Sequence, residues 1–116
     1  MFTLTAQHRF HLYSEPTDMR KSFDGLSGLI RNNLDREPGS GEVFVFINRP
    51  RNKIKLLHWV GSGYVLYYKR LEEGTFEIPQ YDNTVGSIAL SYTQLVMMID
   101  GLSIKNIVRR KRFERV

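Results

Sequence analysis

The stretch VFVFINRPRNKIKLLHWVGSGYVLYYKR, residues 43–70, contains three runs rich in aromatic and β-branched residues. These runs, 43–48, 53–60 and 64–70, are separated by segments of four and three residues that hold proline, asparagine and glycine. Such side chains favour pleated strands, and connections of this length favour hairpins. The stretch therefore predicts an antiparallel meander.

Weaker strand signals lie on both sides of this stretch. Residues 9–13 predict a first strand that ends before Pro16, because the residue before a proline is pushed toward extended geometry. Residues 75–78 and 85–90 predict two shorter strands.

Two segments have helical spacing. Apolar residues recur every three or four positions from Phe23 to Leu34, so we expect a helix over 18–34, capped by Thr17 or Asp18 and ended by the PGSG segment at 38–41. Gly25 and Gly28 lie on one face of it, where the missing Cβ would allow close approach to a sheet.

A second helix is expected to begin at Ser91 or Thr93 and to end at Gly101, with Leu95, Met98 and Ile99 on its apolar face. The fold class we expect is therefore α+β: an antiparallel meander sheet of about five strands, two helices packed on it, and a basic C-terminal tail.

Length and composition limit the architecture. A chain of 116 residues with 41% hydrophobic and 25% charged residues has room for one core, so we expect a single globular domain over 1–104 and a tail over 105–116. The longest apolar runs have five residues, too short to cross a membrane, and residues 1–10 have no pattern of a secretion signal. A cytoplasmic location is expected. With no cysteine, disulfides and thiolate zinc sites are excluded.

The excess positive charge is concentrated in the tail. The chain has a net charge of +5, and residues 105–116 hold six cations against the one acid Glu114. These cations are Lys105, Arg109, Arg110, Lys111, Arg112 and Arg115. A cationic segment attracts polyanions, so the tail predicts contact with nucleic acid; the alternative is a segment that only confers solubility.

A second group of cations lies inside the predicted meander. Arg49, Arg51, Lys53 and Lys55 are spaced by two, so they share one side wherever the chain is extended, and Lys69 or Arg70 on the next strand can join them. With a nearby tyrosine (Tyr64, Tyr67 or Tyr68), such a face suits phosphate contact and base stacking. The alternative is a solvated outer face of the sheet.

A third pair of cations, Arg20 and Lys21, lies near the start of the first predicted helix, where the helix dipole disfavours positive charge. This placement indicates an anion or an acidic partner; the alternative is an ion pair of Asp18 with Lys21.

No residue pattern indicates catalysis. His8, His11 and His58 lack metal-ligand spacing and are interpreted as partly buried strand residues, and the acidic residues lie mostly at turns and helix ends. Neither glycine cluster matches a nucleophile elbow or a phosphate loop. We expect no enzyme activity, metal or cofactor.

Two motifs, PTDMRKSFDGL at 16–26 and FVFINRPRNKIKLLHWVGSGYVLYYKRLEEGTF at 44–76, together with LSYTQLVMMIDGL at 90–102, resemble a known family. This is the TnpB family of small accessory proteins, encoded by the second reading frame of insertion sequences of family sixty-six and distinct from the RNA-guided nucleases of the same name. The matching positions are Asp18, Arg20, Lys21, Phe23, Asp24, Gly25, Lys55, Trp59, Gly61, Gly63, Tyr68, Lys69 and Arg70.

The resemblance implies a non-catalytic role in transposition beside a separate transposase. We expect binding to DNA, to the transposase, or to both; the alternative is an adaptor that docks on the transposase without touching DNA. The residues expected to contact nucleic acid are Arg20, Lys21, Arg49, Arg51, Lys53, Lys55, Lys69, Arg70, Arg109, Arg110, Lys111 and Arg112. The sequence leaves open whether the chain forms a homodimer.

Overall fold

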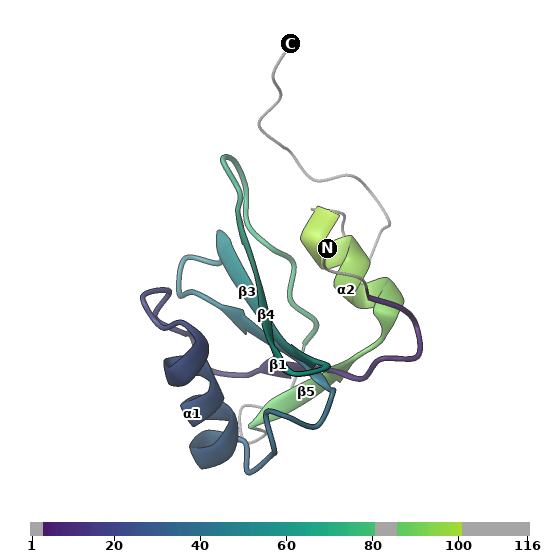
Figure 1. Ribbon diagram of the computed structural model, residues 1–116. Coiled ribbons are helices and arrows are strands. Elements are labelled where there is room, and N and C mark those ends of the chain that lie inside the picture. The colour runs from purple at the N-terminus through teal and green to yellow at the C-terminus, as the bar shows by residue number, and fades with distance from the viewer. Residues whose placement is uncertain (1–3, 81–85, 101–116) are drawn as a thin grey trace.

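Five strands form one sheet in the order β4-β3-β2-β1-β5 in the computed structural model, which describes residues 4–80 and 86–100 (Figure 1). The elements along the chain are β1 (Phe10–Tyr13), α1 (Phe23–Asn33), β2 (Val43–Ile47), β3 (Lys53–Val60), β4 (Gly63–Arg70), β5 (Ser87–Leu90) and α2 (Tyr92–Asp100). The α+β class is confirmed. The tail at 105–116 and Gly101 lie outside the described residues.

The predicted meander is confirmed for β2, β3 and β4, which pair antiparallel in succession. The sheet as a whole is mixed, however, so the expectation of a purely antiparallel sheet was wrong. β1 pairs parallel with β2, with Phe10 opposite Val43, and antiparallel with β5. The reason is the helix between β1 and β2: a helical crossover returns the chain so that the next strand can run in the same direction.

The strand expected at 75–78 does not form. Phe76 is buried, and its backbone N–H donates to the carbonyl of Arg51 at 2.7 Å. The segment is therefore held by one anchored aromatic side chain and not by a strand ladder. The strand expected at 85–90 appears as β5 at 87–90, and Val85 lies outside the described ranges.

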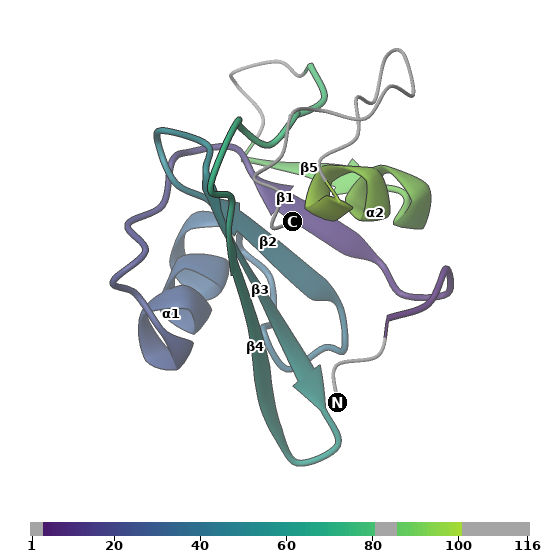
Figure 2. The same ribbon diagram turned by 90° about the horizontal axis from the view of Figure 1, so that it is seen from above.

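The sheet separates two apolar clusters, with α1 on one face and α2 on the other (Figure 2). On the α1 face, Leu26 and Ile30 pack on Phe44, Phe46 and Leu57. On the α2 face, Leu95 and Met98 are joined by Phe76 and by the other alternate residues of the strands. Successive apolar side chains of β2 and β3 belong alternately to the two clusters, because neighbouring side chains of a strand point to opposite faces and both faces of this sheet are buried.

Helix α1 begins at Phe23, five residues later than expected. Neither Thr17 nor Asp18 caps it; the Asp18 carboxylate accepts from the N–H of Arg20 at 2.9 Å, and the N-cap residue Ser22 makes no side-chain cap bond. Residues 17–22 are instead a loop. Aspartate is common both at helix N-termini and in short turns of this kind, so the residues around Asp18 could not show which of these two structures forms.

The expected role of the glycines in α1 was wrong. A Cβ at Gly25 would meet Lys21 Cβ at 3.1 Å, and a Cβ at Gly28 would meet nothing within 4 Å. The side chains of Leu26 and Ile30, and not these glycines, make the contact with the sheet.

Ser91 caps α2. Its Oγ accepts from the N–H of Gln94 at 3.1 Å, and its own N–H donates to Gln94 Oε1 at 2.9 Å, which is a capping box. In the described ranges, neither helix has the length and apolarity needed to cross a bilayer.

Candidate functional site

A groove of about 600 Å³ lies between the loop that precedes α1 and the turn that joins β2 to β3. We call it the cationic groove, because Arg20 reaches it from the loop before α1, and Arg49 and Lys53 reach it from the β2–β3 hairpin. Its lining residues are Pro16, Thr17, Asp18, Met19, Arg20, Asn48, Arg49, Lys53 and Tyr68. Three of the cations expected from the sequence are thus brought to one surface.

The loop wall of the groove is held by Lys55. This lysine is only 5% exposed, and its Nζ donates to the carbonyls of Met19 and Lys21, each at 2.7 Å. Burial lowers the pKa of Lys55, against an opposing effect of the Asp18 charge. The expectation that Lys55 belongs to an exposed cationic face was therefore wrong, because its ammonium is engaged inside the protein.

Tyr68 lies across from Lys55 on the neighbouring strand and is 50% exposed. The Lys55 ammonium is 4.6 Å from the centre of the Tyr68 ring, a cation–π contact. The buried Lys55 therefore holds a half-exposed aromatic ring that lines the groove.

The opposite wall is the β2–β3 turn, which is ordered by two asparagines. Asn48 Oδ1 accepts from the N–H groups of Asn52 and Lys53, each at 3.0 Å, and Asn48 Nδ2 donates to Asn52 Oδ1 at 2.7 Å. Arg51 has a φ of 60°, so the chain is not extended there. The alignment expected for an extended chain therefore fails at Arg51. Arg49 lines both the cationic groove and a smaller cavity beside it, whereas Arg51 lines only the smaller cavity of the two.

Asp18 is the acid of the groove, and its partner is Arg20 and not Lys21. Arg20 Nε and Nη2 donate to the carboxylate, the shortest bond being Nη2 to Oδ2 at 2.7 Å. The hydrogen bonds from Arg20 lower the pKa of Asp18 to about 2. Lys21 does not line the groove, and its backbone carbonyl accepts a hydrogen bond from Lys55 Nζ.

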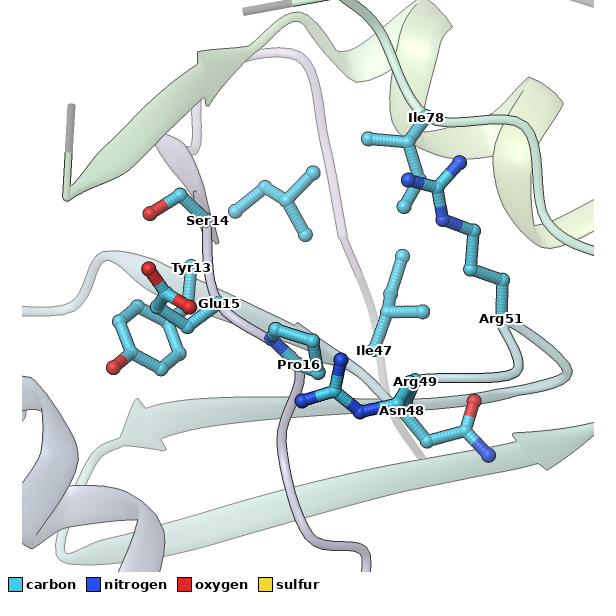
Figure 3. Close-up of a pocket in the computed structure, with 10 residues that line it drawn as sticks. Tyr13, Ser14, Glu15, Pro16, Ile47, Asn48, Arg49, Arg51 and Ile78 are labelled. Carbon is cyan, nitrogen blue, oxygen red and sulfur yellow. The ribbon is translucent and has the colours of Figure 1, made fainter. Parts of the chain in front are cut away.

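A smaller cavity of about 180 Å³ adjoins the groove and shares Pro16, Asn48 and Arg49 with it. Figure 3 shows Arg49 beside Pro16 and Arg51 extending toward Ile78. The cavity is completed by apolar side chains, among them Leu12 and Ile47, and by Glu15. Arg51 thus belongs to this cavity.

Two further predicted cations are engaged elsewhere. Lys69 Nζ donates to the carbonyl of Ile99 at 2.6 Å, on the α2 face of the sheet. Arg70 lies opposite Lys53 in register, but its Nε donates to Glu72 at 2.7 Å, and this bond raises the pKa of Arg70. The predicted tail residues Arg109, Arg110, Lys111 and Arg112 lie outside the described residues.

The histidines form no metal site in the part of the chain that the structure describes. His11 Nε2 lies 2.6 Å from Glu42 Oε2, and His58 Nε2 lies 3.1 Å from the Gly41 carbonyl. Burial and then the nearby His8 lower the pKa of His58, while the Gly41 carbonyl opposes them. His11 and His58 are buried strand residues, as expected; His8 precedes β1.

Sequence reasoning missed Thr17 and Asn48 as groove residues. Thr17 is buried, its N–H donates to the Ile47 carbonyl at 2.9 Å, and its Oγ1 has no hydrogen-bond partner among residues 4–80 and 86–100. The sequence signal that could have identified Asn48 is its position opposite Asn52 on the two sides of Pro50, because asparagine side chains commonly close turns.

Comparison with known proteins gives a consistent family. The family described as IS66 Orf2 like protein matches residues 8–109. Two relatives from Sinorhizobium fredii (strain NBRC 101917 / NGR234) bear the names "Uncharacterized protein y4jC" and "Uncharacterized protein y4hO". The first is 28% identical over 88% of this chain and 86% of its own length. The second is 35% identical over 74% of this chain and 73% of its own length.

No solved structure gives a significant match to the chain. The family match nonetheless covers most of the sequence, including both walls of the cationic groove. The chain therefore belongs to the IS66 Orf2-like family, small proteins associated with insertion sequences.

Proposed function

We propose that this protein is a non-catalytic accessory factor in the transposition of its insertion sequence, and that it binds DNA through the cationic groove. The observation that carries the proposal is the convergence of Arg20, Arg49 and Lys53 around one hollow. Cations gathered from separate segments repel one another, and a polyanion relieves that repulsion.

The three cations of the groove differ in how free they are to bind a phosphate group. Arg20 is already bonded to Asp18, although its side chain is 92% exposed and Nη1 takes no part in those bonds. Arg49 and Lys53 have no acidic partner among the described residues. These two are therefore the main phosphate ligands that we propose, with Arg20 as a third.

The proposal has a quantitative consequence for salt dependence. Three phosphate contacts on duplex DNA give a slope of log K against log salt of roughly −2.7, and the cationic tail would steepen it. Binding measured by fluorescence anisotropy on the terminal DNA of the element, over a salt series, gives this slope directly.

The matched test compares two double variants of the full chain. Arg49→Gln with Lys53→Gln removes two charges from the groove; Arg9→Gln with Arg31→Gln removes the same charge from exposed positions outside it. We expect the groove variant to weaken binding at least tenfold and to reduce the slope by about 1.8, and the control to change both much less. Equal effects of the two variants would show that only net charge matters and would reject the groove.

The second candidate is a protein-only adaptor that docks on the transposase. The cavity of Figure 3 favours it, because its lining combines the apolar residues Leu12, Ile47 and Ile78 with the cations Arg49 and Arg51, a combination that suits an acidic, partly apolar segment of a partner. Such an adaptor binds purified transposase but gives no steep salt slope with DNA. The same titration therefore separates the two candidates.

A further inference from the structure

We propose that the cationic groove takes a single strand, with one unpaired base stacked on Tyr68 and its flanking phosphates on Arg49 and Lys53. This inference rests on the proposed DNA binding and deepens it, because it states which form of nucleic acid the groove selects.

The exposure of Tyr68 is the first step. Tyr64 and Leu66 stand on the same face of β4 and pack against the α1 cluster, as expected for apolar side chains on a covered sheet face. Tyr68 continues this row beyond the cluster and is left 50% exposed inside a groove. A large ring that is half open to solvent within a hollow is a surface on which another flat ring can stack.

The second step is that this ring is preformed for binding. The Lys55 ammonium lies over the ring at 4.6 Å and is itself fixed by the carbonyls of Met19 and Lys21. Burying an ammonium is costly unless such acceptors satisfy it. Lys55 thus links the ring to the loop wall, so that a ligand meets an already ordered ring and binding costs less conformational entropy.

The third step is the shape of the site. A volume of about 600 Å³ is in the range of pockets that enclose small ligands, roughly 300 to 1,000 Å³, and has room for nucleotides. In a duplex the base faces are covered by their stacked neighbours and are not available to a ring that lines a hollow. An unpaired strand can place a base there while its backbone follows the cations at the rim.

The fourth step is the distribution of charge around Tyr68. Arg49 and Lys53 stand on the turn wall, whereas Asp18 and Arg20 occupy the loop wall. The Asp18 charge is balanced by Arg20, whereas Arg49 and Lys53 have no acidic partner among the described residues. The backbone therefore follows mainly the turn wall, and the base enters between the two walls. This arrangement assigns phosphate and base to different sides of the groove.

The test uses the full chain and DNA of one sequence in two forms: a single strand of roughly 12 nucleotides, within the site sizes typical of single-strand binders, and its duplex. Three variants are compared with the wild type: Tyr68→Ala, Tyr68→Phe and Phe23→Ala. Phe23 is the matched control, because it is 43% exposed and does not line the groove. Circular dichroism melting verifies that each variant is folded.

We expect the wild type to bind the single strand more tightly than the duplex. Tyr68→Ala should weaken single-strand binding about 5- to 100-fold, the loss typical of one stacked base, and change duplex binding little. Tyr68→Phe keeps the ring and should retain most of the affinity, as should Phe23→Ala. Photocrosslinking of a strand carrying 5-iodouracil should label Tyr68, a readout that does not depend on a variant.

The opposite results are equally informative. If the duplex binds as tightly as the single strand, or if Tyr68→Ala leaves single-strand affinity unchanged, the stacking inference is wrong while DNA binding through the groove cations stands. If neither form of DNA binds the wild-type chain, the proposed function itself fails, and the inference fails with it.

Discussion

The Lys55 ammonium lies 4.6 Å from the centre of the Tyr68 ring and at the same time donates to two carbonyls of the loop before α1. One buried cation thus joins strand β3, strand β4 and the loop wall of the cationic groove. Lys55 thus bonds the loop wall of the groove to the sheet, although Lys55 itself is hidden from solvent.

The first prediction concerns that lysine. Lys55→Met keeps most of the side-chain volume but leaves the carbonyls of Met19 and Lys21 without their donor. We expect a loss of about 2 to 4 kcal/mol in the free energy of unfolding, measured by urea denaturation, because hydrogen bonds to charged groups contribute about 1.5 to 3 kcal/mol each and water replaces part of them. Lys53→Met is the control on the same face of β3, with an expected change of at most about 0.5 kcal/mol. Equal losses for the two variants would contradict the anchoring role.

A second prediction tests how the segment after β4 is held. Phe76 is fully buried in the α2-side cluster, although the segment forms no strand. Phe76→Ala should lower the free energy of unfolding by about 3 to 5 kcal/mol, the usual cost of emptying a large core site. Phe23→Ala, on the exposed start of α1, should cost less than about 1 kcal/mol. A mild effect of Phe76→Ala would mean that this segment is not anchored by its aromatic residue.

A third prediction concerns acid stability. Burial raises the pKa of Glu42, but the hydrogen bond and charge of His11, with Arg36 and Ser40, outweigh it and hold this pKa below its usual value of 4.5. A carboxyl whose folded pKa is depressed contributes stability above its unfolded pKa, and this contribution is lost as pH falls through the folded value. Wild-type stability should therefore decline as pH drops below about 4.5.

Glu42→Gln should flatten that decline and be less stable than the wild type at pH 7 by about 1 kcal/mol. Glu37→Gln is the control, because Glu37 is exposed and its contact with Arg31 is 3.5 Å long. Melting temperatures measured from pH 3 to 7 for the three proteins check the prediction, which is wrong if Glu42→Gln and the wild type lose stability in parallel.

Much of the sheet could be predicted from single residues and their neighbours. The runs around Asn48 and Gly61 carry strong strand and turn signals, so β2, β3 and β4 and their pairing follow from local chemistry. The Ser91 cap of α2 was one of two predicted positions for the same reason. The loop at 17–22 was mistaken for helix because Asp18 is as good a turn former as a helix cap.

The cation spacing shows why the candidate site was only partly predictable. Arg20, Arg49 and Lys53 were expected as binding residues and do line one groove, whereas Lys55 is buried and Lys69 and Arg70 are engaged with other groups. Nothing local distinguishes a lysine that faces solvent from one that satisfies carbonyls 34 to 36 positions away.

By itself, the sequence determined the strand meander, the two helices, the absence of cysteine chemistry and the cationic excess of the last twelve residues, because each depends on residue type and short-range spacing. Only the tertiary structure decided that β1 lies between β2 and β5, that the loop before α1 closes on Lys55, and that Tyr68 lines a groove. These features depend on contacts between segments that are distant in the sequence. Such contacts stabilise the protein only after the chain has folded and covered both faces of the sheet.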